Sequence, residues 1–120
     1  MTSLPNPYDG IEFPALSFKP DDDEIGAFIE IVLSNVRQIE IERDGKRRVG
    51  VCLEGEDDDG ALRDWVAWNI GNKQQVRAAN AQLGDRIRIT HLGRDKGARN
   101  QTTAARLFTV EAVSRNGSQP

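Results

Sequence analysis

The stretch "FIEIVLSNVRQIEIERDGKRRVGVCLEGE", residues 28–56, decides the fold. Its first half is dense in β-branched residues and ends, over residues 39–42, in an alternation of isoleucine and glutamate that is typical of a strand with two different faces. The pair Asp44-Gly45 then gives a strong hairpin signal, and a second alternating run follows it. We therefore predict two long antiparallel strands, the first of them either continuous or bent near Ser34-Asn35.

The sequence downstream of this hairpin predicts three further strands and one helix. A strand is expected over "ALRDWVAWNI", residues 61–70, and two more over "DRIRITHLG" and "ARLFTVEAV" near the C-terminus. The helix is expected to begin at a cap on Asn72, with Gln75 in the capping-box position, and to end at Gly84. The order β-β-β-α-β-β predicts an all-β fold with one helix, a five-stranded OB-fold barrel.

The barrel domain is predicted to span residues 25–114. Residues 1–24 contain four of the five prolines and end in an acidic run, which predicts an extended arm outside the regular elements. Apolar side chains in this arm could dock on the domain or on a second copy of the chain, so we expect any homo-oligomer to form through the arm or a strand edge. Residues 115–120 are expected to be a flexible tail.

Composition narrows the class of protein. Cys52 is the single cysteine and His91 the single histidine, which excludes an internal disulfide and a Cys/His zinc site. The sequence contains no P-loop, dinucleotide fingerprint or nucleophile elbow, so we expect no enzymatic activity, no cofactor and no metal. No apolar run of about 18 residues is present, which argues against membrane insertion. The absence of a secretory signal pattern predicts a cytoplasmic location, which is the host cytoplasm for a phage protein.

Positive charge is concentrated in the second half of an acidic chain. The net charge is -3, yet residues 1–60 hold 15 acidic and 6 basic residues whereas residues 61–120 hold 4 acidic and 10 basic residues. Such a distribution allows one positive face to meet a polyanion while the protein as a whole stays acidic. Ordinary solvated surface is the alternative interpretation.

Two basic loops flank the surface on which OB barrels bind their ligands. Cations that follow the phosphates and aromatic rings that stack on bases are the groups that hold single-stranded nucleic acid. The loop between the first two predicted strands contributes Arg43, Lys46, Arg47 and Arg48, and the loop between the last two contributes Arg94, Lys96 and Arg99.

The predicted third and fourth strands supply further candidates. Arg63 and Trp65 share one face of the third strand, while Trp68 lies on the more apolar face. Trp65 is therefore the candidate for base stacking and Trp68 is expected in the core, with core packing of both rings as the alternative. On the fourth strand Arg86 and Arg88 point away from the core; they either contact nucleic acid or pair with nearby carboxylates.

A family resemblance adds to this pattern. The segments "GDRIRITHLGRDKG", residues 84–97, and "ARLFTVEAV" resemble the small OB-fold single-stranded-DNA-binding proteins, including those of actinobacterial phages. The resemblance covers residues 26–113 and implies binding of single-stranded DNA in replication or recombination of a phage or mobile element. This chain departs from the cellular members of that class, because it ends in "NGSQP" where they carry an acidic tail.

The sequence thus supports one leading function and two alternatives. The leading hypothesis is non-enzymatic binding of single-stranded DNA with little sequence preference, through the basic loops and a stacking tryptophan. A protein-protein interaction module is an alternative, because OB folds host many ligands. An RNA-binding protein is the second alternative, because the sequence does not show whether a site recognises the 2′-hydroxyl that distinguishes RNA from DNA.

Overall fold

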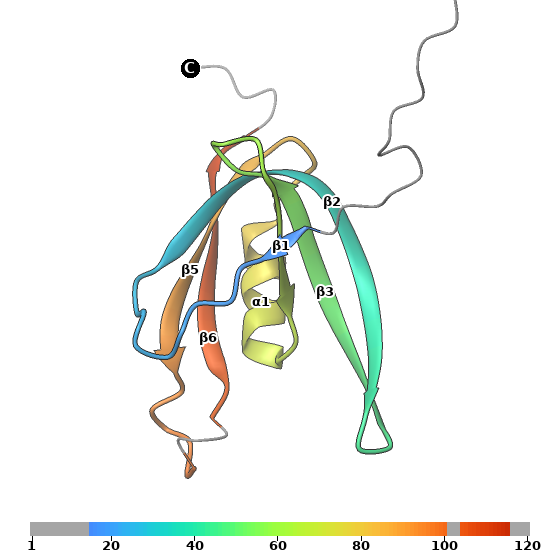
Figure 1. Cartoon of the computed structure of the whole chain (residues 1–120), viewed down its shortest axis with the longest axis vertical. Coiled ribbons are helices and arrows are strands. Elements are labelled where there is room, and N and C mark those ends of the chain that lie inside the picture. Colours follow the sequence, from blue (N-terminus) through green and yellow to red (C-terminus); the bar gives the residue numbers. More distant parts are fainter. Residues whose placement is uncertain (1–14, 101–103, 116–120) are drawn as a thin grey trace, which may run out of the picture.

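The computed structural model describes residues 15–100 and 104–115, and this part of the chain folds into six strands and one helix. These elements are β1 (Leu16–Ser17), β2 (Phe28–Arg43), β3 (Lys46–Glu56), β4 (Leu62–Ala67), α1 (Ile70–Ala79), β5 (Arg86–Arg94) and β6 (Arg106–Ser114). A mostly-β fold with a helix between β4 and β5 is confirmed. The two-residue strand β1 was not predicted (Figure 1).

The long strand β2 joins the two halves of the sheet. Its first residues, from Phe28 to Val32, pair with β5, and the rest of the strand pairs with β3. β2 is a single strand, and its register shifts between Leu33 and Asn35, where the bent alternative placed its bend. The single sheet has the order β1-β4-β3-β2-β5-β6, and Figure 1 shows β2 arching over the molecule so that the sheet curls toward a half-barrel.

The core lies on the concave side of this curl. Ile29, Ile31 and Leu33 alternate along β2 and are all buried. On β5, Ile87 and Ile89 point inward while Arg86 and Arg88 point outward, as the alternation predicts. The remaining large core side chains come from the other strands and the N-terminal segment: Phe18, Leu53, Trp65, Phe108 and Val110.

Helix α1 begins and ends at different residues from those predicted. Asn69, not Asn72, is the N-cap, and its Oδ1 accepts from the Asn72 backbone N–H at 2.8 Å. The helix ends at Asn80, which adopts a left-handed conformation with φ 47°, before it can reach Gly84. The prediction was wrong because Asn69 and Asn72 are both suitable N-cap residues by type. Only the fold shows that Asn69 caps the helix and that the Asn72 side chain has another role.

Asn72 instead binds the edge of β6. Its side chain is buried, with 4 % exposed, and its Nδ2 donates to the carbonyl of Arg106 at 3.0 Å. The backbone N–H of Phe108 donates back to Oδ1 at 3.0 Å. The carboxamide therefore satisfies one acceptor and one donor of the strand edge, as a neighbouring strand would.

The N-terminal segment contacts both β4 and β6. β1 pairs in parallel with β4, and the Phe18 N–H donates to Asp64 O at 2.8 Å. The Phe18 ring packs on Phe108 of β6 with 6.1 Å between ring centroids, and Arg106 donates to the carbonyl of Pro20. Part of the predicted arm is thus a strand and a core segment, which corrects the expectation of a wholly irregular arm.

The other predicted terminal features are described only in part. Arg115, the first residue of the predicted tail, donates to Asp85 Oδ2 at 3.2 Å and to two carbonyls at the end of α1. Residues 1–14 and 116–120 lie outside the described residues. No helix in the described part of the chain has the length and apolarity that a bilayer crossing requires.

Replacing Phe18 with alanine tests whether the N-terminal segment is part of the core. We expect Phe18→Ala to lower the free energy of unfolding by about 3 kcal/mol, because a buried aromatic ring is lost and a cavity is left. Leu16→Ala, two residues away and 64 % exposed, is the control and should change the free energy by less than about 0.5 kcal/mol. Urea unfolding measures both, and equal effects would contradict this assignment.

Candidate nucleic-acid interface

The pairing of β2 with β3 creates a surface on which four cations and two isoleucines alternate. Residues that pair across antiparallel strands share a face, and the face changes at each step along the strand. The register places four successive pairs on the same side of the hairpin: Arg37–Cys52, Ile39–Gly50, Ile41–Arg48 and Arg43–Lys46. Val66 of β4, which pairs with Cys52, and Trp68, the residue just after β4, continue this side. We call these ten residues the basic face.

The acidic residues of the hairpin lie on the opposite side. Glu40 pairs with Val49 and Glu42 with Arg47, one step out of phase with the basic face. Arg47 forms an ion pair with Glu40. The glutamates of β2 therefore do not neutralise Arg43, Lys46 and Arg48, and a locally positive surface forms on an acidic protein.

Trp68 lies flat on the strand beside it. A Cβ placed on Gly50 would come within 2.7 Å of both Trp68 Cε3 and Val66 Cγ1, so only glycine leaves room for the indole there. The Arg48 guanidinium lies 5.4 Å from the centre of the Trp68 ring. Trp68 is half-buried, which leaves part of its ring open to a ligand beside a guanidinium.

The two tryptophans are reversed relative to the sequence-based expectation. Trp65 is only 3 % exposed and packs edge-to-face on Phe108, with 5.2 Å between ring centroids. The prediction that Trp65 faces outward was wrong because it counted Ile70 on the Trp68 face of the strand. Ile70 is in fact the first residue of α1 and is 74 % exposed.

The basic face ends where the hairpin meets the rest of the sheet. Arg37 forms an ion pair with Glu54 at 3.6 Å, and Glu54 pairs in register with Asp64. Cys52 lies beneath this margin with 1 % of its surface exposed. Burial, followed by the nearby Asp64 carboxylate, raises the pKa of the Cys52 thiol, so the thiol is protonated and behaves as an apolar side chain.

Three predicted arginines on the strands are held by carboxylates. Arg63 pairs with Asp57 at 3.6 Å, and its Nε donates to the carbonyl of Leu16. Arg86 and Arg88 both bind Glu30, at 2.9 Å and 2.7 Å from their Nε atoms. Arg86 and Arg88 fit the alternative interpretation of pairing with carboxylates, and Arg63, for which only a ligand contact was predicted, is held in the same way.

Glu30 is the centre of that cluster. Hydrogen bonds from Arg86 and then Arg88 hold the pKa of the Glu30 carboxyl below its usual value near 4.5. Arg86 also binds Asp58, and this bond raises the pKa of the guanidinium. The cluster therefore joins β2, β5 and the β3–β4 turn.

The loop between β5 and β6 presents its cations differently. Arg94 donates to the carbonyl of Ala104 at 2.7 Å and pairs with Asp22 at 3.1 Å, which lowers the pKa of the Asp22 carboxyl. Lys96 and Arg99 are exposed. Figure 1 shows this loop and the tip of the β2–β3 hairpin projecting toward the same end of the molecule.

The basic face thus includes three of the eleven predicted contacts, Arg43, Lys46 and Arg48. Sequence reasoning missed Arg37 and Trp68. The alternation from Arg37 to Arg43 was a usable signal, because it puts both arginines on the side of the two isoleucines. No comparable signal identified Trp68, whose position depends on where β4 ends.

Comparisons with protein-family models, curated proteins and solved structures find no match. Within the described residues, no group of three or more histidine, cysteine, aspartate or glutamate side chains is arranged to hold a metal ion. What the chain does is therefore inferred from its own residues.

Replacing Glu30 with glutamine tests the structural role of Arg86 and Arg88. The pKa of Glu30 is lowered by folding, so its contribution to stability is complete above pH about 4.5 and is lost as the pH falls through the folded-state pKa. We expect Glu30→Gln to lower the free energy of unfolding at pH 7, with the deficit shrinking below pH about 4.5.

Urea unfolding between pH 7 and pH 3 measures this effect. Glu40→Gln is the control, because the Glu40–Arg47 pair is exposed and such pairs contribute little to stability. A deficit for Glu30→Gln that does not depend on pH would contradict the assignment.

Proposed function

We propose that the chain is an OB-fold protein that binds single-stranded DNA, with little sequence preference, across the basic face. The order of elements supports the OB assignment: a long bent strand pairs with both β3 and β5, and the helix lies between β4 and β5. β3 and β4 then correspond to the second and third strands of an OB barrel, whose outer face is its usual ligand surface.

The observation that carries the proposal is that the hairpin places its basic and acidic side chains on opposite sides. The basic face has Arg43, Lys46 and Arg48 for phosphates, and Trp68 for a base. No carboxylate occurs among the ten residues of the basic face. Cations beside an exposed ring are the combination that holds a single strand without reading its sequence.

The biological setting is proposed on the sequence resemblance alone. We infer a role in replication or recombination of a phage or mobile element. A protein-interaction module and an RNA-binding protein are the outcomes that the experiments below separate from this proposal. Binding to a labelled oligothymidine, to its ribose counterpart and to a DNA duplex distinguishes the three.

The first prediction concerns Trp68. We expect Trp68→Ala to weaken binding of oligothymidine about tenfold, because loss of one stacked base costs about 1 to 3 kcal/mol. Fluorescence anisotropy of a labelled oligonucleotide measures the affinity. Val36→Ala, which trims a half-exposed apolar residue outside the basic face, is the control and should leave the affinity unchanged. Equal affinities for wild type and Trp68→Ala would count against the basic face as the site.

The second prediction uses two arginines on opposite sides of one hairpin. Arg43→Gln should reduce the slope of log affinity against log salt by about 0.7, because each phosphate contact to a single strand releases about that fraction of a counterion. Arg47→Gln removes the same charge from the opposite side and should leave the slope unchanged. Equal changes in the two variants would mean that the whole hairpin acts as a diffuse charge.

A further inference from the structure

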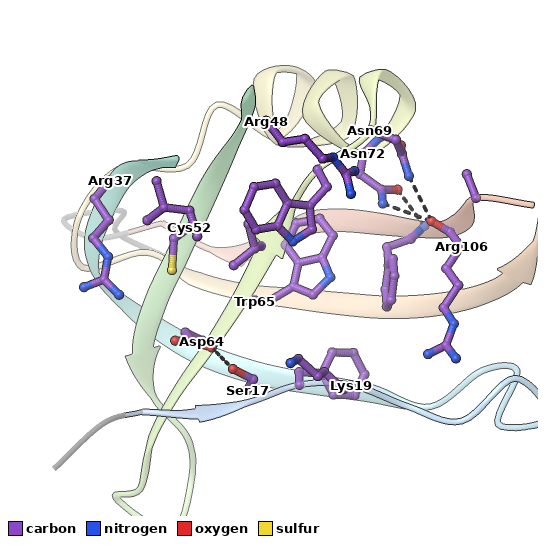
Figure 2. Close-up of a pocket in the computed structure, with 16 residues that line it drawn as sticks. Ser17, Lys19, Arg37, Arg48, Cys52, Asp64, Trp65, Asn69, Asn72 and Arg106 are labelled. Atoms are coloured by element: carbon purple, nitrogen blue, oxygen red, sulfur yellow. Dashed lines mark hydrogen bonds between the residues drawn. The ribbon is translucent and has the colours of Figure 1, made fainter. Parts of the chain in front are cut away.

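A cavity of about 610 Å³ opens beside the basic face, at the seam between the two ends of the sheet. β4 pairs with β1 only through Arg63 and Asp64, so beyond Asp64 the next residues of β4 face β6 across a gap. Figure 2 shows Trp65 in the middle of this cavity, with Asn69, Asn72 and Arg106 on one side and Ser17 and Lys19 on another. Its volume is within the range of sites that take small organic molecules.

The walls of the cavity are aromatic and contain an unused hydrogen-bond donor. Phe18, Trp65 and Phe108 line it, and they meet edge to face. Trp65 is 3 % exposed, and no described residue accepts from its indole N–H. Within the described residues, His91 Nε2 is the fully buried side-chain nitrogen that lacks a partner, so Trp65 Nε1 is not sealed off and can donate to an acceptor on a flat ligand in this cavity.

The amides near Trp65 are held in place by backbone groups. Asn69 and Asn72 both donate to the carbonyl of Arg106, at 3.2 Å and 3.0 Å. Asn72 Oδ1 accepts from Phe108 N, and Asn69 Oδ1 accepts from Asn72 N. Each carboxamide nitrogen has a second N–H, so the Trp65 N–H is one of the donors on this wall that a ligand can use.

The charge around the cavity favours an anionic ligand. Lys19, Arg37, Arg48 and Arg106 line it, against a single carboxylate, Asp64, which accepts from Ser17 Oγ at 2.6 Å. Arg37 and Arg106 have carboxylate partners, Glu54 and Asp22. Within the described residues neither Arg48 nor Lys19 forms an ion pair, and Figure 2 shows these two on opposite sides of Trp65.

The cavity is continuous with the basic face. Arg48 and Trp68 belong to both surfaces, so a strand that stacks on Trp68 passes the mouth of the cavity. A nucleotide combines the features that the cavity selects: a flat ring with acceptors and a flanking phosphate. Removing a base from a single strand costs less than flipping it out of a duplex.

We propose, on the basis of the function proposed above, that this cavity takes one base of the bound strand. The base packs against the aromatic walls and accepts a hydrogen bond from Trp65 Nε1. Arg48 and Lys19 bind the phosphates on either side of it. Trp65 would then be a ligand contact from within the barrel, in addition to the base that stacks outside on Trp68.

Two single-tryptophan proteins test the proposal. Trp68→Phe keeps Trp65 as the only tryptophan, which is excited selectively over the single tyrosine, while Trp65→Phe keeps an aromatic ring in the core but removes the indole N–H. Each is titrated to saturation with an oligothymidine of about 15 nucleotides, a length near the upper site size of one OB fold. A matched oligomer of deoxyribose phosphates without bases is titrated in parallel, and anisotropy reports binding in every case.

We expect oligothymidine, but not the baseless oligomer, to quench Trp65 emission in the Trp68→Phe protein. Trp65→Phe should bind oligothymidine about fivefold more weakly than wild type, as expected for one lost hydrogen bond. Its affinity for the baseless oligomer should be unchanged, and this arm shows that the protein has kept its fold and its phosphate contacts.

The unfavourable outcomes separate the two proposals. If oligothymidine binds and quenches Trp68 in the Trp65→Phe protein but leaves Trp65 emission unchanged in the Trp68→Phe protein, the base cavity is overturned and the basic face stands. If the baseless oligomer quenches Trp65 equally, the quenching does not come from a base and the cavity proposal is again overturned. If the wild-type protein shows no anisotropy change with oligothymidine at low salt, single-strand binding itself is overturned.

Discussion

The open seam between β4 and β6 is the constraint on which the rest of the structure depends. A curled sheet that does not close leaves backbone groups at its two ends that need partners. At one end β1 pairs with β4, and at the other the Asn72 carboxamide binds both Arg106 O and Phe108 N. β1 and the Asn72 side chain form the hydrogen bonds that the backbone groups at the two edges need, but they do not fill the space between β4 and β6. The helix and the N-terminal segment are therefore held in place by contacts with the two open edges of the sheet, and a cavity remains between these edges, beside the proposed binding surface.

The basic face is positive because the hairpin places basic and acidic side chains on opposite sides, and not because the chain has an excess of basic residues. Along β2 and β3 the two-residue period puts Glu40 and Glu42 on the side opposite Arg43, Lys46 and Arg48. A shift of one residue in the pairing would bring the glutamates onto the side of Lys46 and Arg48. The Asp44-Gly45 turn, in which both residues have positive φ, fixes that register. Net charge consequently says little about what this chain can bind.

The two tryptophans show where prediction from local sequence patterns fails. Alternation correctly assigned Ile87 and Ile89 to the core, because β5 is regular from Ile87 to His91 and has one clearly apolar side there. It failed on β4, where the strand ends at Ala67 and the helix begins only three residues later. Because the prediction counted Ile70 as part of the strand, it took the wrong face of the strand for the core face and exchanged the roles of Trp65 and Trp68. The candidate stacking residue was therefore misassigned although the strand itself was found.

The sequence by itself determined the elements that depend on neighbours along the chain: the hairpin, and the order in which β2 to β6 and the helix follow one another. These features follow from turn chemistry and short-range periodicity, which need no knowledge of distant contacts. Only the tertiary structure decided that Phe18 belongs to the core and that Asn72 serves β6 while Asn69 caps the helix. Those roles depend on contacts between residues up to about 90 positions apart, such as Phe18 with Phe108, whose free energy is realised only when the sheet has curled.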